Sequence, residues 1–546
     1  MNKNGPVAIQ KLRHRNISYW SLLTVLIIVM LAAALRIRLL QIPLERDEGG
    51  YAYTAQLILQ GIPPFEQAYD MKMPGLYYLY VLILLIFGQT TIGIHLGLLV
   101  INAATIVLMF FLGRRLLDTV AGLVAAATYA VISLSQHVQG FTANAEQLLL
   151  LPALAGILLL FRAIDSGRLK IFFAGGLLMG LALVIKHHGI FFVGFVAICL
   201  FVSYSKKPRS RWRRYLLEYA VFLLAVLIPF AMLCAVFLAY GLFDKFWFWL
   251  FVYPPEYSSV FPRLIGLIFL KFALLKMAQS ALLIWILALI GLIVLICRTK
   301  KEKQNLSIIF FCLVSFASII PGYRFYPHYF ILALPAVALL AGAGISAVAA
   351  LLANSKTRLI GYGIPVLLAA APIIYAVFAE KAYLFELSPN RISRISYFGF
   401  PFVESVKIAD YIKQHTSPDD SIAILGSEPQ ICFYAKRRSA TSHIYVYPLM
   451  GKHKYVSQMQ SEMIRQIETA RPEFIVFVNM QTSWATQSYS DRSIFKWFEE
   501  YRRKYYRLVG VIDIISPEKS IYRWNQDAAN YRPLSPPWVS VLKRIK

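Results

Sequence analysis

Acidic and basic residues gather in one polar segment near the amino terminus, between two apolar runs. Glu45-Arg46-Asp47-Glu48 follows the first run, and Tyr69-Asp70-Met71-Lys72 comes later in the same segment. A carboxylate at a membrane boundary can accept the proton of an attacking hydroxyl, because a low dielectric raises its pKa toward the working range. The alternative is structural: Asp47 and Glu48 open a helical pattern, where carboxylates cap the helix and are favoured by its dipole.

A second acid favours the catalytic interpretation. Glu146 stands at the mouth of a later apolar run, and ionisable residues at membrane depth usually face a cavity. Because acids from two loops can share one site, we predict that Asp47 and Glu146 are the catalytic carboxylates.

Cations stand at or near junctions between polar loops and apolar runs: Lys72, Lys186 and Arg324. Snorkelling of a long side chain to the interface is the ordinary explanation for such a position. Together with the acids, however, these cations predict a pocket that holds an anionic leaving group such as a phosphate and stabilises its developing charge.

Histidines accompany these cations. His187 and His188 follow Lys186 directly, and His328 lies shortly after Arg324. Histidine and carboxylate together suit divalent cations, but no His-Glu-x-x-His spacing is present. The sequence therefore leaves a bound divalent cation open and requires no other cofactor.

The composition is that of an integral membrane protein. Of the 546 residues, 58% are hydrophobic and only 15% are charged, and the mean hydropathy is +0.59; soluble domains rarely combine such values. The net charge of +27 favours basic cytoplasmic loops over nucleic-acid binding.

Hydropathy predicts a polytopic α-helical protein with about eleven spans, which are Tyr19 to Leu35, Ile92 to Leu112, Thr119 to Leu134, Glu146 to Phe161, Ile171 to Ile185, Gly189 to Tyr204, Tyr215 to Tyr240, Phe272 to Cys297, Leu306 to Ile320, Tyr329 to Leu352 and Leu359 to Phe378. The shorter run Leu76 to Phe87 is predicted to lie on the outer surface. Counting it as a span would move the basic runs 206–214 and 298–303 to the outer side. With Leu76 to Phe87 left out of the spans, the amino end and the basic runs are cytoplasmic, and 41–91 is the first outer loop with surface helices.

The last part of the chain differs from the rest. Hydrophobicity drops after the last span, which predicts a membrane domain over 1–379 and a soluble, non-cytoplasmic α/β domain over 380–546. The patterns predict helices at Phe402 to His415, Met459 to Ala470 and Ser493 to Lys504, and strands at Ile422 to Leu425, Phe474 to Val478 and Leu508 to Ile512. No phosphate-binding glycine loop is present, which favours a structural or acceptor-guiding role for this domain.

The order of these features resembles glycosyltransferase family 39. The resemblance is carried by Arg46-Asp47-Glu48-x-x-Tyr51, by Lys72-Met73-Pro74-Gly75-Leu76-Tyr77-Tyr78, by Asn144-Ala145-Glu146, by Lys186 at a span end and by His328-Tyr329-Phe330-Ile331-Leu332-Ala333-Leu334-Pro335. That family has the GT-C membrane fold and includes protein O-mannosyltransferases and the transferases that add aminoarabinose to lipid A.

The resemblance implies a role for each site residue. Asp47 matches the base that receives the acceptor proton, Glu146 is the second carboxylate, and Glu48 is a supporting or metal-facing partner. Lys72, Lys186 and Arg324 become ligands of the carrier phosphate. The further pocket residues are Tyr51, His187, His188, His328 and Tyr329.

The chain departs from the family pattern at three places. Met73-Pro74 stands where members often have two prolines, and Met71 precedes Lys72 where some members have an acid, which weakens a metal carried over by analogy. His328 stands where an arginine is expected, which makes Arg324 the phosphate ligand.

The resemblance implies an inverting glycosyltransferase of the cell (inner) membrane. It moves a hexose or pentose from a polyprenyl-phosphate carrier to a hydroxyl or phosphate of a lipid, glycan or protein acceptor on the non-cytoplasmic face. The alternative from another class is a transporter or flippase of lipid-linked sugars. Transporters usually show paired halves with midplane sites, whereas this chain shows no internal repeat and its acids gather at one face.

Overall fold

The computed structural model describes residues 17–205, 209–259, 262–298, 304–355 and 357–545. The basic amino end, and the parts of the basic runs at 206–208 and 299–303, lie outside the described residues. The chain forms two compact units, each built from three separated segments. The first unit comprises Met1–Leu39, Leu96–Leu233 and Arg263–Glu386, and the second comprises Leu40–His95, Cys234–Pro262 and Leu387–Lys546.

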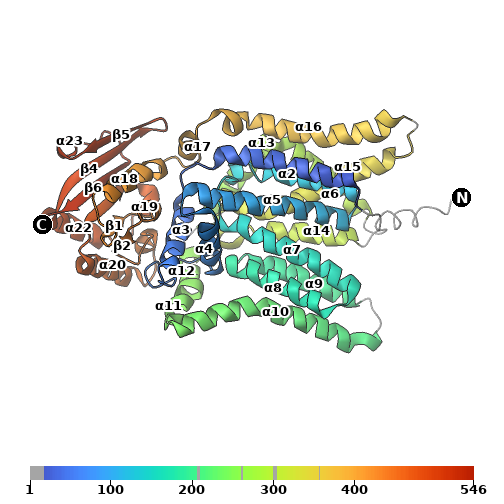
Figure 1. The fold of residues 1–546 in the computed structure, drawn as a ribbon, viewed down its shortest axis with the longest axis horizontal. Helices are drawn as coiled ribbons and strands as arrows, with labels where there is room; N and C mark the ends of the chain where they lie inside the picture. The colour runs from blue at the N-terminus through green and yellow to red at the C-terminus, as the bar shows by residue number, and fades with distance from the viewer. Residues whose placement is uncertain (1–16, 206–208, 260–261, 299–303, 356, 546) are drawn as a thin grey trace. The chain divides into compact units, whose positions relative to one another are not determined.

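The first unit is a bundle of apolar helices: α2 (Tyr19–Leu39), most of α5 (Thr91–Leu116), α6 (Thr119–Ile132), α7 (Ala145–Ser166), α8 (Leu169–Ile185), α9 (Gly189–Ser205), most of α10 (Trp212–Ala239), α13 (Arg263–Arg298), α14 (Gln304–Ala317), α15 (Leu334–Leu352) and α16 (Ile364–Ala379). Neighbours in sequence pack together, as α7, α8 and α9 do (Figure 1).

Each of the eleven predicted spans falls on an apolar helix. Seven of the described helices are long and apolar enough to cross a membrane, and they include a 26-residue segment over Pro327–Leu352. The other four predicted spans coincide with the shorter helices α6, α8, α9 and α14, whose crossing of the membrane stays a prediction. The run at Leu76 to Phe87 forms α4 (Gly75–Phe87), a helix of 13 residues, and its place on the outer surface also stays a prediction.

Helix α15 is the centre of the bundle. Its apolar segment is 89% buried inside the protein, whereas that of α16 is only 17% buried, so most of the apolar side chains of α16 face outward. Small residues bring helices close to α15: a β-carbon at Gly342 would press on the backbone carbonyl of Ala121 in α6, and one at Gly291 in α13 would overlap the carbonyl of Leu340. Such contacts are typical of helix packing in membranes.

A buried arginine orders the segment that leads to Glu146. Arg36 in α2 donates hydrogen bonds to Asn102 Oδ1 at 3.1 Å, to the carbonyl of Ser133 at 3.1 Å and to the carbonyl of Gly140 at 2.8 Å. An arginine inside an apolar bundle is costly unless its donors are satisfied. These bonds therefore fix the polar turn before α7.

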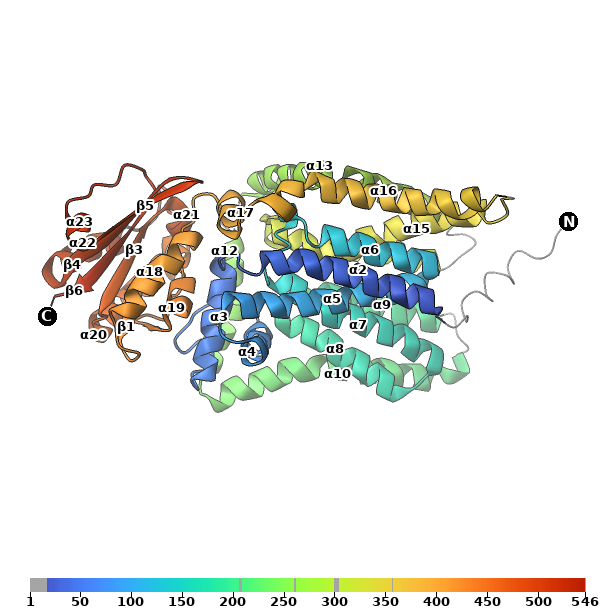
Figure 2. The same cartoon turned by 45° about the horizontal axis from the view of Figure 1, so that its top comes forward.

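The second unit contains the first polar segment and the C-terminal domain. Residues 40–95 form α3 (Arg46–Leu59) in the polar segment and the apolar helix α4 after it. Residues 234–262 add the short helices α11 (Phe243–Trp247) and α12 (Tyr253–Ser259). The C-terminal domain has one six-stranded sheet in the order β2-β1-β3-β6-β4-β5 (Figure 2). The strands are β1 (Ser421–Leu425), β2 (Arg438–Ser439), β3 (Phe474–Asn479), β4 (Tyr506–Ser516), β5 (Lys519–Trp524) and β6 (Trp538–Arg544).

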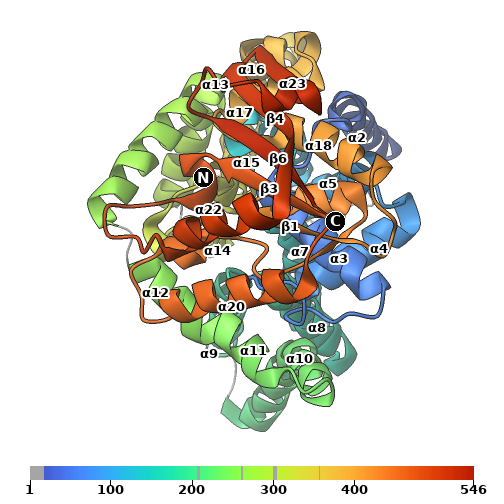
Figure 3. The same cartoon turned by 90° about the vertical axis from the view of Figure 1, so that its left-hand side faces the viewer.

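Helices cover both faces of this sheet. Side chains alternate along a strand, so Phe474 of β3 contacts Tyr411 in α18 (Phe402–Gln414), while Phe477 stacks on Phe498 in α22 (Ser493–Tyr505). Figure 3 shows the two helices on opposite sides of the sheet. All three predicted helices and all three predicted strands are present, with α20 (Val456–Ala470) as the third helix.

The strand pairing was not predicted. β1 pairs parallel with β2 and β3, but β6 from the end of the chain inserts antiparallel between β3 and β4. The sheet is therefore mixed, and β2, β5 and β6 are additions to the predicted elements. A strand that pairs far from its neighbours in sequence leaves no local signal of where it pairs.

The compact units also differ from the predicted division at 379/380. The unit that contains the C-terminal domain includes the first polar segment, because α19 (Gln430–Ala435) packs directly on α3. Gly49 permits this approach, since a β-carbon there would lie 2.5 Å from Gln430 Cβ. Hydropathy separates apolar from polar sequence and does not detect such packing.

Candidate functional site

The start of α3 is held by a capping box. The Glu45 carboxylate accepts a hydrogen bond from the Glu48 backbone N–H at 3.1 Å, and the Glu45 N–H donates to Glu48 Oε2 at 3.4 Å. This reciprocal arrangement satisfies backbone donors that a helix leaves unpaired. The capping alternative considered for the acids of this segment therefore applies to Glu48.

Glu48 has a further partner in the same unit. Its Oε1 lies 3.1 Å from His95 Nε2, and His95 Nδ1 lies 2.9 Å from the carbonyl of Leu40. Both side chains are almost fully buried. Glu48 thus stabilises the fold of the segment. Sequence reasoning missed His95, whose one signal is a histidine within an apolar run.

Asp47, by contrast, faces outward and meets the other predicted residues of the segment. Lys72 Nζ lies 2.9 Å from Asp47 Oδ2, and the Tyr51 hydroxyl donates to the same oxygen at 3.2 Å. The side chains of Asp47 and Lys72 keep 22% and 21% of their surface exposed. The structure therefore brings Asp47, Tyr51 and Lys72 together in a group open to solvent.

Asp70 extends this group. It is buried, and it accepts hydrogen bonds from the Tyr77 hydroxyl at 3.0 Å and from the Met71 N–H at 2.6 Å. Burial raises the pKa of Asp70 to about 6, while the charge of Lys72 opposes that rise. We name Asp47, Tyr51, Asp70 and Lys72 the Asp47 cluster. Asp70 was not predicted as a site residue, although its place two residues before Lys72 was a signal.

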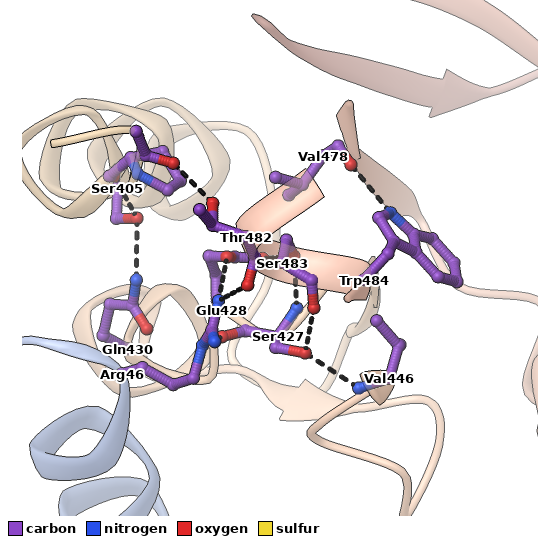
Figure 4. Close-up of polar contacts among 12 residues, drawn as sticks. Arg46, Ser405, Ser427, Glu428, Gln430, Val446, Val478, Thr482, Ser483 and Trp484 are labelled. Carbon is purple, nitrogen blue, oxygen red and sulfur yellow. Dashed lines mark hydrogen bonds and ion pairs between the residues drawn. The ribbon is translucent and has the colours of Figure 1, made fainter. Parts of the chain in front are cut away.

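The C-terminal domain anchors the residue next to Asp47. Arg46 donates to the carbonyls of Ser427 at 2.7 Å and Thr482 at 3.0 Å, and its Nη2 lies 3.4 Å from Glu428 Oε1. Figure 4 shows the arginine reaching these groups, with Ser483 donating to the other oxygen of Glu428. Because the guanidinium is held at three points, the first turn of α3 is fixed against the domain.

A second group forms in the helical unit around Glu146. Glu146 is buried in the first turn of α7, and its Oε1 pairs with Lys186 Nζ at the end of α8. His328 Nε2 lies 3.8 Å from the same oxygen. Lys186 and His328, both predicted as site residues, therefore contact Glu146, the predicted second acid. We name these three residues the Glu146 cluster.

Further residues surround the Glu146 cluster. His328 Nδ1 contacts Gln139 Oε1 at 2.9 Å, and Lys186 Nζ lies 4.4 Å from the centre of the Tyr329 ring. The His188 ring packs against Tyr329 at 5.5 Å. Gln139 was not predicted; its backbone adopts a positive φ of 53° at the end of a short helical turn.

The remaining predicted residues lie nearby in sequence and take other contacts. His187 lies in the turn from Lys186 to Gly189, where the Gly189 N–H donates to the Lys186 carbonyl at 2.9 Å. Arg324 donates to the Tyr326 hydroxyl at 3.4 Å. The acid is therefore met by His328, at the position where the family pattern has arginine, and a role for Arg324 stays a prediction.

The described residues contain no group of three His, Cys, Asp or Glu side chains placed to hold a metal ion. The donor sets agree, because Asp47 is bound by an ammonium group, Glu48 by a histidine and a backbone N–H, and Glu146 by Lys186. Ammonium groups next to carboxylates do not favour a second cation at the same oxygens. Asp47 and Glu146 therefore do not fit a divalent cation.

Known proteins share this architecture. Residues 71–252 match the family model described as dolichyl-phosphate-mannose-protein mannosyltransferase. The crystal structure of ArnT from Cupriavidus metallidurans bound to undecaprenyl phosphate superposes with a TM-score of 0.55 at 14% identity, over 96% of this chain and 98% of ArnT. The chain has the GT-C fold.

A second solved structure with this GT-C fold supports the assignment. The archaeal oligosaccharyltransferase AglB from Archaeoglobus fulgidus, in complex with an inhibitory peptide and a dolichol-phosphate, superposes with a TM-score of 0.55 at 14% identity, over 96% of this chain and 76% of AglB. No curated protein matches the chain. The predicted fold class and the resemblance to GT-C glycosyltransferases are thereby confirmed.

The family match covers only part of the site. Residues 71–252 include Lys72, Glu146 and Lys186, whereas Asp47 and His328 lie outside them. The assignment of Asp47 therefore depends on the sequence pattern and on the local geometry of α3.

Proposed function

We propose that the chain is an inverting glycosyltransferase that uses a polyprenyl-phosphate sugar as donor and a hydroxyl or phosphate group as acceptor. The GT-C fold and the match to a mannosyltransferase family model support this activity. The observation that carries it is the Asp47 cluster, in which a solvent-open carboxylate is oriented by Lys72 and Tyr51 above a buried acid.

Asp47 is the general base in this proposal. The acceptor O–H gives its proton to the Asp47 carboxylate as its oxygen forms a bond to the anomeric carbon. The bond from that carbon to the phosphate oxygen breaks on the opposite face, so the configuration inverts. The electron pair leaves on polyprenyl phosphate.

Cations balance the charge of that leaving group. Lys72 holds Asp47 in the resting structure at 2.9 Å. When the proton moves to Asp47, the attraction between Lys72 and this carboxylate falls, and Lys72 becomes available to a phosphate oxygen. Preorganised cations of this kind stabilise charge that develops in the transition state.

In place of the predicted catalytic role of Glu146, the proposal gives the Glu146 cluster a binding role, because this acid is paired with Lys186. Lys186 is a ligand of the carrier phosphate, and Glu146 together with His328 fixes its ammonium group. A buried ammonium without a counter-charge destabilises the fold. Glu146 thus supplies the counter-charge of Lys186 in the resting structure, and Arg324 is proposed as a further phosphate ligand.

The acceptor is a lipid, a glycan or a protein, and the reaction takes place on the non-cytoplasmic side of the cell membrane. The predicted order of spans places the basic loops on the cytoplasmic side and the loop that bears Asp47 on the other side, which supports this assignment. The apolar carrier tail and the membrane lipids are partners of the helical unit, whose outer helices offer apolar surface.

Release of polyprenyl phosphate tests the proposal. Purified protein in membranes that supply native acceptors is given a panel of radiolabelled polyprenyl-phosphate sugars. We expect Asp47→Asn to reduce release at least 100-fold, because loss of a general base typically costs about 10²- to 10⁴-fold. Asp419→Asn, which neutralises an exposed acid in a turn of the same unit, is the matched control and should release the carrier at the wild-type rate.

The outcomes separate the two classes of function. Equal release by wild type and Asp47→Asn would remove Asp47 from the mechanism. Donor that crosses vesicle membranes without any release of polyprenyl phosphate would show a transporter or flippase instead.

A further inference from the structure

A tyrosine of the C-terminal domain lies against the Asp47 cluster. Tyr445 is only 3% exposed, and it stands between β2 and the short helical turn Tyr447–Met450. Its ring packs beside Tyr447, with centres 5.6 Å apart. Tyr445 belongs to the same compact unit as α3.

The Tyr445 hydroxyl has no hydrogen-bond partner within the part of the chain that the structure describes. Two other phenols of this domain have partners: the Tyr506 hydroxyl donates to the carbonyl of Pro472 at 2.7 Å, and the Tyr434 hydroxyl accepts from the Leu44 N–H at 2.8 Å. A buried hydroxyl without a partner costs the protein its full desolvation penalty. A buried polar group of this kind calls for an explanation, and a hydrogen bond to a bound ligand is one.

The hydroxyl points to the catalytic face of α3. A β-carbon added to Gly50 would overlap the Tyr445 oxygen, so the phenol fills the space that the missing side chain leaves. Asp47, Gly50 and Tyr51 are three and four residues apart and therefore share one face of the helix. Burial, and then the charges of Asp70 and Asp47, raise the pKa of Tyr445.

This setting suits a ligand rich in hydroxyl groups. The carboxylates of Asp47 and Asp70 only accept hydrogen bonds when ionised, whereas the Tyr445 hydroxyl can donate one. A sugar ring offers oxygens that do both. A ligand that reaches the solvent-open side of Asp47 comes close to Gly50, where the Tyr445 hydroxyl fills the space of the missing side chain.

We propose that Tyr445 is a substrate-binding residue of the Asp47 cluster, whose hydroxyl donates a hydrogen bond to a hydroxyl oxygen of the sugar on the polyprenyl-phosphate donor. The inference rests on the proposed function and deepens it. The C-terminal domain then helps to select the sugar, and the Tyr445 hydroxyl finds its partner only when donor is bound.

The test uses Tyr445→Phe in the full chain, with the radiolabelled polyprenyl-phosphate sugar that the wild type turns over fastest. A hydrogen bond of ordinary net strength corresponds to about a 3- to 10-fold change in affinity. We expect KM for the donor to rise by that factor with little change in kcat. The penalty should disappear with the deoxy donor that lacks the hydroxyl bound by Tyr445.

Thermal stability supplies a second readout of opposite sign. Tyr445→Phe removes no hydrogen bond of the free protein, so its melting temperature should equal or exceed that of wild type. Tyr506→Phe, the matched control, removes a satisfied bond and should lower the melting temperature without changing KM.

Each outcome decides between the proposals. A donor KM within 2-fold of wild type, or a penalty that persists with every deoxy donor, would overturn the role of Tyr445 while Asp47→Asn remains inactive. A fall in melting temperature like that of Tyr506→Phe, with KM unchanged, would make the hydroxyl structural. Wild-type release by Asp47→Asn, or no turnover of any donor by wild type, would instead overturn the proposed function and the inference with it.

Discussion

The ion pair between Arg46 and Glu428 predicts a large and specific loss of stability when the arginine is removed. Glu428 has no exposed surface and Arg46 keeps only 14%. Burial raises the pKa of Glu428, and the positive charge of Arg46 is the main influence that opposes the rise. Arg46→Ala therefore leaves a buried carboxylate without its counter-charge.

The magnitude follows from the geometry. At 3.4 Å and an effective dielectric constant of about 20, the attraction is about 5 kcal/mol before desolvation is counted. Removing one partner of a buried pair typically costs about 3 to 5 kcal/mol. The guanidinium also donates hydrogen bonds to the carbonyls of Ser427 and Thr482, and their removal acts in the same direction. We therefore expect Arg46→Ala to cost about 3 to 5 kcal/mol.

The double variant Arg46→Ala with Glu428→Gln isolates the charge. A neutral amide does not need the counter-charge, so about half of the loss should return. Protonation of Glu428 also removes its need for a counter-charge. Because folding raises the pKa of Glu428, the contribution of this residue to the stability is complete at low pH and falls as the pH rises through the folded pKa. The defect of Arg46→Ala should therefore be smaller at pH 5 than at pH 8.

Thermal unfolding in lipid nanodiscs measures these effects. For a folding unit of this size, about 1 kcal/mol corresponds to about 2 to 4 °C, so Arg46→Ala should melt at least 6 °C below wild type. A shift under 2 °C, or a double variant no more stable than Arg46→Ala, would refute the role given to the buried charge.

Two further buried acids give predictions of their own. Folding raises the pKa of Asp70 from 3.8 to about 6, so the stability that Asp70 contributes is complete below pH 3.8 and is lost as the pH rises through 6. The melting temperature of Asp70→Asn should therefore exceed that of wild type at pH 7.5 and equal it at pH 4. Parallel pH profiles of the two melting temperatures would contradict this. Glu146→Gln leaves the Lys186 ammonium buried without its acid, so we expect a cost of about 3 kcal/mol. A Glu146→Gln, Lys186→Met double variant should recover most of the lost melting temperature, and an additive loss would count against the pair.

Local sequence signals were sufficient for most of the elements and for part of the site. Apolar runs marked the helices of the bundle, and alternating or helical periods marked the six predicted elements of the C-terminal domain. Asp47 and Lys72 were predicted to share one site as an acid and a cation of the same polar segment, and the structure joins them in an ion pair. The contact between Glu146 and Lys186 could be anticipated because α7 and α8 are consecutive helices joined by a short turn, which brings them together as antiparallel neighbours.

The partners that the sequence did not reveal are distant in the chain or carry no local pattern. Glu428 and Tyr445 lie hundreds of residues after α3, and neither stands in a motif. His95 meets Glu48 only because α5 begins beside the start of α3 in the folded unit. Such pairs depend on tertiary packing, which periodicity does not report.

Gly49 and Gly50 show how much of this packing is carried by absent side chains. In the sequence they are two small residues after a cluster of acids. In the structure each is filled by the C-terminal domain, Gly49 by the backbone and β-carbon of Gln430 and Gly50 by the phenol of Tyr445. An alanine at Gly49 would press on the backbone of Gln430, and one at Gly50 would displace the Tyr445 hydroxyl. Arg46 fixes the same approach one turn earlier. The glycines and the arginine thus bring the C-terminal domain against the face of α3 that bears Asp47. This packing is the reason why we propose that the domain contributes Tyr445 to substrate binding.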